Sequence, residues 1–518
     1  MGKTQAYESK REQLRRVSEE ELKKAAQDRR YMFFGFVLTA VQLAATVAFI
    51  VVLHRMNILP TDYKVLVDVL LLLFVVITAI TQRWRIPGWI TKILAFLMTV
   101  ILIVAASYVQ ITSRALTNIT GTTTKLTTVN VYTLSEHGYD SVNALLEAVP
   151  DASFGILAVM DRTNTNEAVA EVEADCGMTL SLTEYETLQE LAAGLYTGEV
   201  EAVFLNTSYV GLFEDMEGYG DFTEVTSVLT SMEKEEEVAD IGDVTIDTTE
   251  ERELIHCEDG HVFTIYISGM DIEGSPYAYR NSDVNILCVV NRQTKQILLL
   301  NTPRDYYVTM AWDGGVMDKL THAGCHGIEC SVNTLQNLYG LQIDDYVKVN
   351  FSGFRQVIDS LGGVDVWSTY EFTSYHGNYY FHQGYNTMNG DQALCFCRER
   401  YAFGSGDNQR GHNQMEVIKA VILKLQSSEL LKNYSSVLNS LSSNMATSMS
   451  YEEITELIRT QLEDGTSWDI HMIAVWGSGD NQYCYSLGAA NYVMWPNEEA
   501  LTMADQYLKA IYNDEIIN

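Results

Sequence analysis

The chain contains few basic residues. Lysine and arginine number 34 of 518 residues, against 68 aspartate and glutamate residues, so the formal net charge is −34. Nucleic-acid-binding proteins neutralise phosphates with a basic face, and this composition argues against a general nucleic-acid binder. Proline is also scarce, with 6 residues, whereas 47% of the residues are hydrophobic and 10% are aromatic. These values exclude a chain that is disordered overall, and the length allows two or three packed domains.

No Cys-x-x-Cys pair occurs, which argues against a structural zinc site. Cys325 and Cys330 are close enough in sequence to form a disulfide in a small loop. Free buried thiols fit the sequence equally well, and both alternatives stay open. Cys395 and Cys397 lie in an apolar run that we interpret as a strand, which would point both side chains to one face. The cysteines are Cys176, Cys257, Cys288, Cys325, Cys330, Cys395, Cys397 and Cys484.

Three apolar runs lie within the first 110 residues: Tyr31–Leu53, Val65–Ile80 and Ile93–Val109. The first run has about 23 residues without a charge, which is enough to cross a hydrocarbon core of about 30 Å. The middle run is shorter and contains Asp68, so a buried or re-entrant helix is the alternative for it. We expect three transmembrane helices, with Asp68 facing a neighbouring helix because an isolated carboxylate is unfavourable in lipid.

The charges that flank these runs predict the orientation of the chain. Residues 1–110 carry a net charge of +6, whereas residues 111–518 carry −40. The basic flanks before the first run and between the second and third belong on the cytoplasmic side. An odd number of spans then places residues 111–518 outside the cytoplasm, in a multi-pass protein of the cell membrane. A cleaved signal peptide fits less well, because the first apolar run begins after thirty residues and two more follow.

Beyond the membrane segment, the sequence predicts two α/β domains. Short apolar strands alternate with helical segments between Val129 and Leu229, which is typical of a small α/β domain, and Phe263 opens a larger one. The acidic residues of the small domain are scattered as on a solvated surface, and the acidic stretch Met232–Arg252 favours a linker or edge hairpin over a metal site. The predicted parts are a cytoplasmic basic tail (1–30), a membrane anchor (31–110), a stalk (111–128), an accessory domain (129–250) and a larger domain (251–518).

Polar residues stand at the ends of three strands predicted in the larger domain. The strand that begins at Phe263 leads to Asp271, Asp283 precedes the second strand, and the third strand ends at Arg304. The second and third strands are separated by a short turn, so hairpin pairing would bring Asp283 and Arg304 to one rim of the sheet. Functional sites of α/β folds lie at such rims.

Three arginines fall within thirteen residues of this acidic region: Arg398, Arg400 and Arg410. We interpret the run before the first two as a strand, whose alternation sends both side chains from one face. Arg410 and Gln414 lie one turn apart near the start of a predicted helix, where free N–H groups and the helix dipole favour an anion. The cluster predicts a site for an anion with several negative charges, although salt bridges to neighbouring carboxylates explain it equally well.

Two further segments belong to the larger domain. Lys319 offers another donor of the kind that binds phosphate, although a lone lysine is more often solvated. A predicted helix is capped by Ser352 and ends at Gly362. Its apolar stripe suits core packing or a cavity that holds a lipid. The stripe consists of Phe354, Val357, Ile358 and Leu361.

Residues 262–430 resemble the LytR-CpsA-Psr (LCP) family of cell-wall ligases. The resemblance rests on seven motifs in the family's order: SGMD, RNSDVNI, LLNTPRD, DKLTHAG, VNFSGFRQVIDSLGGVDV, MNGDQALCFCRER and DNQRGHNQ. The α/β segment before them looks like the accessory domain of capsule-type members, and the three-span anchor is similar to theirs. The sequence departs from the family's pattern at Asn281, inserted into the usual Arg-Ser-Asp, and at His412-Asn413, where Arg-Gln-rich text is usual.

The resemblance implies an α/β catalytic domain with a central mixed sheet flanked by helices. It implies transfer of a capsular polysaccharide or teichoic-acid-like polymer, as its sugar-phosphate, from undecaprenyl diphosphate to a hydroxyl of peptidoglycan. Asp271 and Asp283 would hold Mg²⁺, and Asp283, Arg304, Arg398 and Arg400 would be the catalytic residues. The diphosphate would be bound by Arg280, Arg304, Lys319, Arg398, Arg400, Arg410 and Gln414.

Elementary physical chemistry supports this expectation independently. A lipid diphosphate has a charged head and a long apolar tail, so its site needs an arginine rim beside an apolar cavity. Phosphoryl transfer requires positioning and charge neutralisation, which arginine forks and a dication held by carboxylates supply. Two alternatives stay open at this point: a regulatory protein that binds polyprenyl phosphates without turnover, and a lipid-diphosphate hydrolase.

Overall fold

The structure is a computed structural model in which the packed chain divides into two units. The first contains residues 1–115 and 452–465, and the second contains residues 116–451 and 466–518. The structure describes residues 2–517 except 57–58, 60, 83–84, 120–123, 238–253, 271–276, 313, 405, 427–439, 441–444 and 466.

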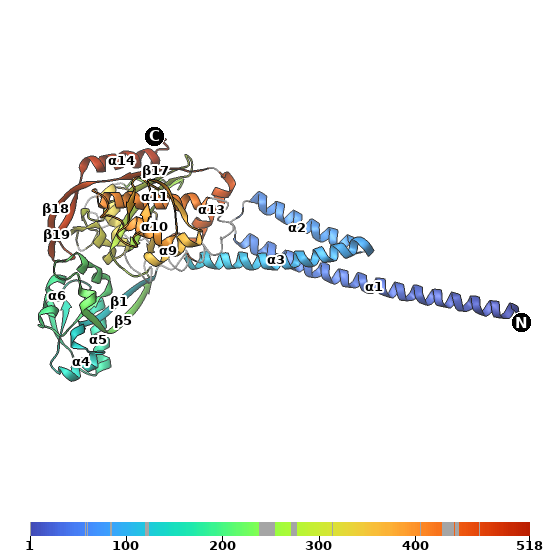
Figure 1. Ribbon diagram of the computed structural model, residues 1–518, viewed down its shortest axis with the longest axis horizontal. Helices are drawn as coiled ribbons and strands as arrows, with labels where there is room; N and C mark the ends of the chain where they lie inside the picture. Colours follow the sequence, from blue (N-terminus) through green and yellow to red (C-terminus); the bar gives the residue numbers. More distant parts are fainter. Residues whose placement is uncertain are drawn as a thin grey trace. The chain divides into compact units, whose positions relative to one another are not determined.

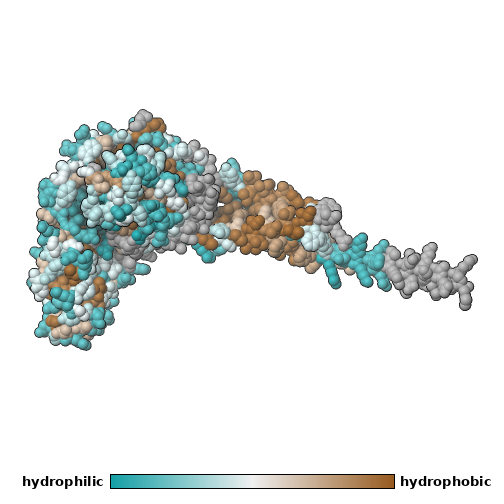
Figure 2. Space-filling model, in the orientation of Figure 1, coloured by the Kyte–Doolittle hydropathy of each residue, from teal (hydrophilic) through white to brown (hydrophobic). Residues whose placement is uncertain are grey.

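The first unit consists of long helices (Figure 1). Three of them contain segments long and apolar enough to cross a membrane, Glu19–Met56, Thr61–Thr81 and Trp89–Ile111. Figure 2 shows apolar residues over most of their visible surface. The prediction of three apolar N-terminal helices is therefore confirmed. The helices of this unit are α1 (Gly2–Met56), α2 (Thr61–Thr81), α3 (Arg85–Ile119) and α13 (Tyr451–Asp464).

The acidic residue of the middle apolar run faces a neighbouring helix, as predicted. The side chain of Asp68 on α2 forms a hydrogen bond of 2.9 Å with Nε2 of His54 on α1. Pairing the carboxylate with the imidazole reduces the free energy required to place it in an apolar environment. The predicted stalk, residues 111–128, contains regular secondary structure at both ends. Helix α3 continues to Ile119, and the first strand begins at Thr124.

The accessory domain is a five-stranded mixed sheet with helices, in the strand order β3-β2-β4-β1-β5. The strand β2 is parallel to β3 and β4, whereas β1 is antiparallel to β4 and β5. Its elements are β1 (Thr124–Leu134), η1 (Ser135–His137), α4 (Val142–Ala148), β2 (Ser153–Leu157), α5 (Arg162–Cys176), β3 (Ser181–Tyr185), α6 (Leu188–Thr197), β4 (Ala202–Asn206), η2 (Thr207–Asp215), α7 (Phe222–Val225) and β5 (Thr226–Glu237).

The acidic stretch after this domain begins as an edge strand. Glu233 and Glu235 lie on β5, which pairs with β1 and forms one edge of the sheet. Charged side chains on an edge strand discourage pairing with other chains. The edge-hairpin alternative therefore describes the first part of the stretch, and residues 238–253 lie outside the described residues.

The larger domain is built on a six-stranded mixed sheet of the order β16-β11-β6-β7-β8-β17. The central strands β6, β7 and β8 are antiparallel neighbours, and β11 and β17 add parallel strands on either side. The strands of this sheet are β6 (Val262–Met270), β7 (Ser282–Asn291), β8 (Gln296–Asn301), β11 (Asp345–Asn350), β16 (Met445–Thr447) and β17 (Asp469–Ala474). The predicted mixed sheet and its β7–β8 hairpin are confirmed.

Helices flank this sheet and form two apolar cores. Inward-facing side chains of β6, β7 and β8 pack with α8 and α14 in one core, and α9, α10 and α11 pack with β12 and β15 in the other. The remaining elements are β9 (Tyr307–Thr309), β10 (Met317–Lys319), η4 (Leu320–His326), α8 (Ile328–Tyr339), α9 (Phe351–Ser360), β12 (Val364–Ser368), β13 (Phe372–Thr373), β14 (Tyr380–Phe381), β15 (Gly384–Met388), α10 (Gly390–Arg398), α11 (Asp407–Leu425), β18 (Gly477–Cys484), β19 (Ala489–Pro496) and α14 (Glu498–Tyr512).

Two local interpretations of the sequence were wrong. The run that ends at Arg398 is the helix α10, not a strand, because Asn389 and Gln392 form a capping box that starts a helix there. The cap of α9 is Asn350, whose side chain accepts from the backbone N–H of Gly353, and Ser352 lies inside the helix. The helix itself lies close to the predicted range, so the error concerns its first turn.

The eight cysteines are free thiols, including Cys325 and Cys330. The disulfide alternative is therefore not realised. Cys395 and Cys397 lie on α10, so two residues of separation place them about 200° apart around the helix rather than on one face.

The accessory domain and the larger domain share an apolar core. Leu212 and Phe213 of η2 are buried in the same cluster as Leu487 and Val493 of the larger domain. Burial of apolar surface is the main favourable term in folding, and here it joins segments of both domains. We therefore expect the two domains to unfold together.

Replacing Leu212 with alanine tests this shared core. Leu212 has no exposed surface, so Leu212→Ala should lower the free energy of unfolding by about 2–5 kcal/mol. Hydrogen–deuterium exchange of the full chain in detergent should show faster exchange in both β4 and β19. The control is Leu182→Ala, because Leu182 is 38% exposed in the same domain. Faster exchange confined to the accessory domain would show that the domains unfold independently.

Candidate functional site

A cavity of about 260 Å³ lies where β6 and β11 end and β7 begins. One group of lining residues is apolar: Ile267, Met270, Val284, Val349, Phe351, Phe354, Leu394, Cys397 and Ile418. A second group is charged or polar: Glu214, Asp215, Asp283, Arg304, Asn350, His376, Arg398, Arg400, Tyr401, Arg410 and Gln414. The cavity therefore has a rim that carries arginines and a wall of apolar side chains.

Six of the predicted site residues line this cavity together. They come from the start of β7, the segment after β8, the end of α10 and the first turns of α11. These residues are Asp283, Arg304, Arg398, Arg400, Arg410 and Gln414. Only the positions of Asp283 and Arg304 follow from correctly predicted strand ends. Phe354 of the predicted apolar stripe also lines the cavity, whereas Val357, Ile358 and Leu361 pack in the neighbouring core. Core packing is therefore confirmed for three residues of the stripe, and a lipid-holding role for the cavity that Phe354 lines stays a prediction.

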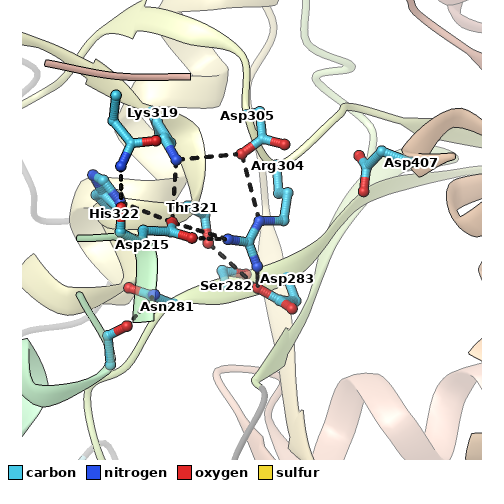
Figure 3. A network of polar contacts seen from close by, with 12 residues as sticks. Asp215, Asn281, Ser282, Asp283, Arg304, Asp305, Lys319, Thr321, His322 and Asp407 are labelled. Atoms are coloured by element: carbon cyan, nitrogen blue, oxygen red, sulfur yellow. Dashed lines mark hydrogen bonds and ion pairs between the residues drawn. The ribbon is translucent and has the colours of Figure 1, made fainter. Parts of the chain in front are cut away.

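Arg304 lies at the centre of the charged residues (Figure 3). Its Nη1 donates to Oδ1 of Asp283 at 2.7 Å, its Nη2 donates to Oδ2 of Asp215 at 3.1 Å, and its Nε lies 3.6 Å from Oδ1 of Asp305. Burial by itself would lower the pKa of Arg304, but these three carboxylates raise it above its ordinary value. The guanidinium is therefore permanently charged and fixed in orientation.

The end of α10 brings two further arginines to the rim. The guanidinium of Arg398 lies 4.4 Å from the ring centroid of Phe351, and Nη2 of Arg400 donates to the hydroxyl of Tyr401 at 2.8 Å. Between them, the buried carboxylate of Glu399 accepts from the backbone N–H of Tyr401 at 2.8 Å. Glu399 thus fixes the backbone that follows the helix.

The start of α11 supplies Arg410 and Gln414. Arg410 Nη1 lies 3.8 Å from Oδ2 of Asp283, and Arg410 also pairs with Asp407 in the first turn. Gly411 allows α11 to pack against the end of β8. A Cβ atom at this position would lie 2.2 Å from the side-chain amide nitrogen of Asn301, the last residue of that strand. A larger residue at this position would require the Asn301 side chain or the helix to shift.

Three predicted residues are not among the described lining residues. Lys319 is 3% exposed and lies behind Asp215, to which its Nζ donates at 3.1 Å. Arg280 is half-buried beside the accessory domain, where burial lowers its pKa and the charge of Glu214 opposes that shift. Asp271 lies outside the described residues. The roles of these three residues as ligands stay predictions.

No sequence motif indicates the carboxylate that the accessory domain contributes. Asp215 is the last residue of η2, and it reaches Arg304 and Lys319 of the larger domain. Burial opposes ionisation, but the nearby His322, Arg304 and Lys319 hold the pKa of Asp215 well below its ordinary value. The interpretation of every acidic residue in this domain as solvated surface was therefore wrong for Asp215.

A buried ion pair lies behind this carboxylate. Nδ1 of His322 lies 2.6 Å from Oδ1 of Asp318, and both side chains are fully buried. Burial would raise the pKa of Asp318, but the charge of His322 and hydrogen bonds from Ser486 lower it to about 2. Burial likewise opposes the charge of His322, yet Asp318 and Asp215 raise its pKa above the ordinary value. Folding therefore favours the charged form of His322.

Replacing His322 with glutamine tests this charge. A histidine whose pKa is raised by folding stabilises the fold fully below its unfolded pKa of about 6.5, and this contribution is lost as the pH rises through the folded value. The loss of thermal stability in His322→Gln should therefore be larger at pH 6 than at pH 9. Thermal unfolding of the two chains in detergent measures it. An equal loss at both pH values would contradict a charged His322.

The chain is similar in sequence to several known proteins. Polyisoprenyl-teichoic acid–peptidoglycan teichoic acid transferase TagU of Enterococcus faecalis is 29% identical over 219 residues, which are 42% of this chain and 71% of the relative. The protein of the same name in Oceanobacillus iheyensis is 35% identical over 184 residues, covering 34% of this chain and 56% of the relative. Among solved structures, TagV of B. subtilis is 26% identical, covers 49% of this chain and 98% of that chain, and has a TM-score of 0.42.

The family model is the broadest of these matches. The LytR_cpsA_psr family model matches residues 221–506, which include β6, β7 and β8, the helices α8 to α11 and all described residues of the charged rim except the two from η2. This range is more than half of the chain. The chain therefore belongs to the LytR-CpsA-Psr family.

Proposed function

We propose that this protein transfers a glycopolymer, as its sugar-phosphate, from undecaprenyl diphosphate to a hydroxyl group of peptidoglycan. The observation that carries the proposal is one cavity with arginines at its rim and an apolar wall. The TagU relatives are named as transferases of teichoic acid to peptidoglycan, which supports the same class of reaction here. A capsular polysaccharide and a teichoic-acid-like polymer both fit as the glycan transferred.

The two halves of the cavity match the two halves of such a donor. An isoprenoid is a chain of apolar units, and it gains free energy by lying against side chains such as Ile267, Val284, Phe354 and Ile418. A diphosphate favours guanidinium groups, which donate paired hydrogen bonds to its oxygens. Arg398, Arg400 and Arg410 are the rim residues to which we assign this contact.

We further propose that Mg²⁺ takes part, held by Asp283 and Asp271. Carboxylate oxygens are the ligands that this ion prefers, and the carboxylate of Asp283 lines the cavity. Met270, which directly precedes Asp271 in sequence, pairs with Ser282, which directly precedes Asp283. These donors fit a hard dication, which would offset negative charge on the diphosphate when bound.

Besides holding the metal ion, the residues of the site would bind the diphosphate and accept a proton from the acceptor hydroxyl. Arginines at the rim would neutralise and orient the diphosphate, so that the acceptor hydroxyl approaches the phosphorus that carries the glycan. The new oxygen–phosphorus bond forms as the bond to the bridging oxygen breaks, and undecaprenyl phosphate leaves. A rim carboxylate, with Asp283 as the first candidate, would accept the proton of the hydroxyl.

The apolar helices suit a donor that cannot leave the bilayer. We propose that all three span the cell membrane and that the domains after them lie outside the cytoplasm, on the side where peptidoglycan is found. Tethering then raises the effective concentration of the site near the membrane-bound donor.

Removing one rim arginine tests the site directly. Arg398→Ala and Arg304→Ala should each reduce transfer of a labelled glycan from its polyprenyl diphosphate to peptidoglycan fragments by at least about 100-fold, because each removes charge stabilisation that operates during transfer. The full chain in nanodiscs is used, with Arg162→Ala as the control, since Arg162 pairs with Glu184 on the surface of the accessory domain. Transfer at the control rate by both site variants would reject the site.

Removal of divalent cations tests the proposed Mg²⁺. Transfer should stop when a chelator is added and should return when Mg²⁺ is supplied in excess, because the diphosphate would otherwise keep uncompensated charge. Asp283→Asn should need a higher Mg²⁺ concentration for half-maximal rate. A full rate in the chelator would contradict the metal assignment. Release of phosphate without acceptor would favour a hydrolase, and binding of donor without product would favour a regulatory protein.

A further inference from the structure

The accessory domain reaches the cavity at the end of η2. The start of η2 is anchored by Asn206, whose side chain accepts from the N–H of Ser208 at 3.0 Å and donates to Asp161 at 2.6 Å. Leu212 and Phe213, which follow in η2, are 0% and 1% exposed in the core shared by both domains. The position of Asp215, two residues later, is therefore fixed by packing.

The backbone of Asp215 is also held by the larger domain. The side-chain amide of Asn491 on β19 donates to the carbonyl oxygen of Asp215. Nearby, the side chain of Asn281 lies 3.5 Å from the carbonyl oxygen of Gly211. Asn281 directly precedes the first residue of β7, so this contact lies beside the strand that supplies Asp283.

The carboxylate of Asp215 pairs with cations that belong to the larger domain (Figure 3). Its Oδ2 lies 3.1 Å from Nζ of Lys319 and 3.1 Å from Nη2 of Arg304, and Nε2 of His322 is 3.9 Å away. The Lys319 and His322 side chains are 3% and 0% exposed. Buried cations need a compensating charge, and breaking such a pair leaves an uncompensated one.

These contacts determine how Arg304 is presented to the cavity. Asp215 accepts a hydrogen bond from Nη2 of the guanidinium and Asp283 accepts one from Nη1, while Asp305 lies beside Nε. Without Asp215, Asp305 would be the one remaining carboxylate of this group near both Lys319 and Arg304. Its Oδ1 lies 3.7 Å from Nζ of Lys319. Arg304 would keep its contacts with Asp283 and Asp305 but lose the one that holds Nη2, so its orientation would be less restricted.

We propose that Asp215 is a positioning residue of the transfer reaction, supplied by the accessory domain. Its carboxylate offsets the charge of Lys319 and fixes the Arg304 guanidinium, which in turn fixes Asp283 at the cavity. The accessory domain is therefore an integral part of the active site rather than a separate module. This inference rests on the proposed transferase function.

The test compares Asp215→Asn with the wild-type full chain in nanodiscs, using a polyprenyl-diphosphate-linked disaccharide donor and peptidoglycan fragments. Asp215 acts through Arg304, so kcat should fall by about tenfold to 100-fold, and KM for the donor should change by less than about twofold. Asp215→Glu keeps the charge and should retain more activity than Asp215→Asn. The matched control is Glu217→Gln, which removes an exposed acidic charge two residues away.

A second substitution separates positioning from folding. Lys319→Met removes the charge that Asp215 offsets, so the fall in kcat caused by Asp215→Asn should be smaller in the Lys319→Met background. This double variant also carries the test if Asp215→Asn alone loses its fold, as measured by thermal unfolding. Equal falls in both backgrounds would contradict the proposed coupling to Lys319.

The outcomes distinguish this inference from the function on which it rests. No transfer by the wild-type chain would reject the transferase function. Transfer by the wild type together with Asp215→Asn equal to Glu217→Gln would reject the positioning role and leave the function standing. A raised KM for the donor with unchanged kcat would also overturn the inference, because it would assign Asp215 to donor binding instead.

Discussion

The pairing of Arg304 with carboxylates from separate segments is the interaction on which the site depends. A guanidinium that is 13% exposed would be unfavourable alone, and three carboxylates compensate it. Asp283 comes from β7, Asp305 follows β8, and Asp215 comes from the accessory domain, so one charge network joins both domains. The apolar core that the two domains share holds the segments that carry these charged side chains in position.

The cavity combines two environments that would ordinarily be kept apart. Arginine side chains need hydrogen-bond acceptors or water, whereas apolar side chains offer neither. Both kinds of side chain line this cavity, so a polar region and an apolar region meet inside it. A ligand with a charged head and an apolar tail satisfies both sides at once, whereas a free sugar phosphate or a hydrocarbon satisfies one. This constraint explains why the proposed donor is a lipid diphosphate.

Much of this architecture could be predicted from the sequence. The apolar runs and strand ends gave the three helices, the β7–β8 hairpin and the meeting of Asp283 with Arg304. Arg398 and Arg400 line the cavity with the other predicted residues, but from a helix rather than the predicted strand. An apolar run of this length suits a strand, whereas the capping box at Asn389 starts a helix. Asp215 could not be predicted, since the contact joins residues 89 positions apart and depends on how two domains pack.

Identifying the molecule that occupies the cavity tests directly whether the site binds a lipid diphosphate. The full-length protein is purified from native membranes, and lipids that remain bound are identified by mass spectrometry, with Arg398→Ala purified in parallel. We expect a polyprenyl diphosphate or its glycan-linked form on the wild-type chain, and much less of it on the variant. Recovery of ordinary phospholipids alone, in equal amounts from both chains, would contradict it.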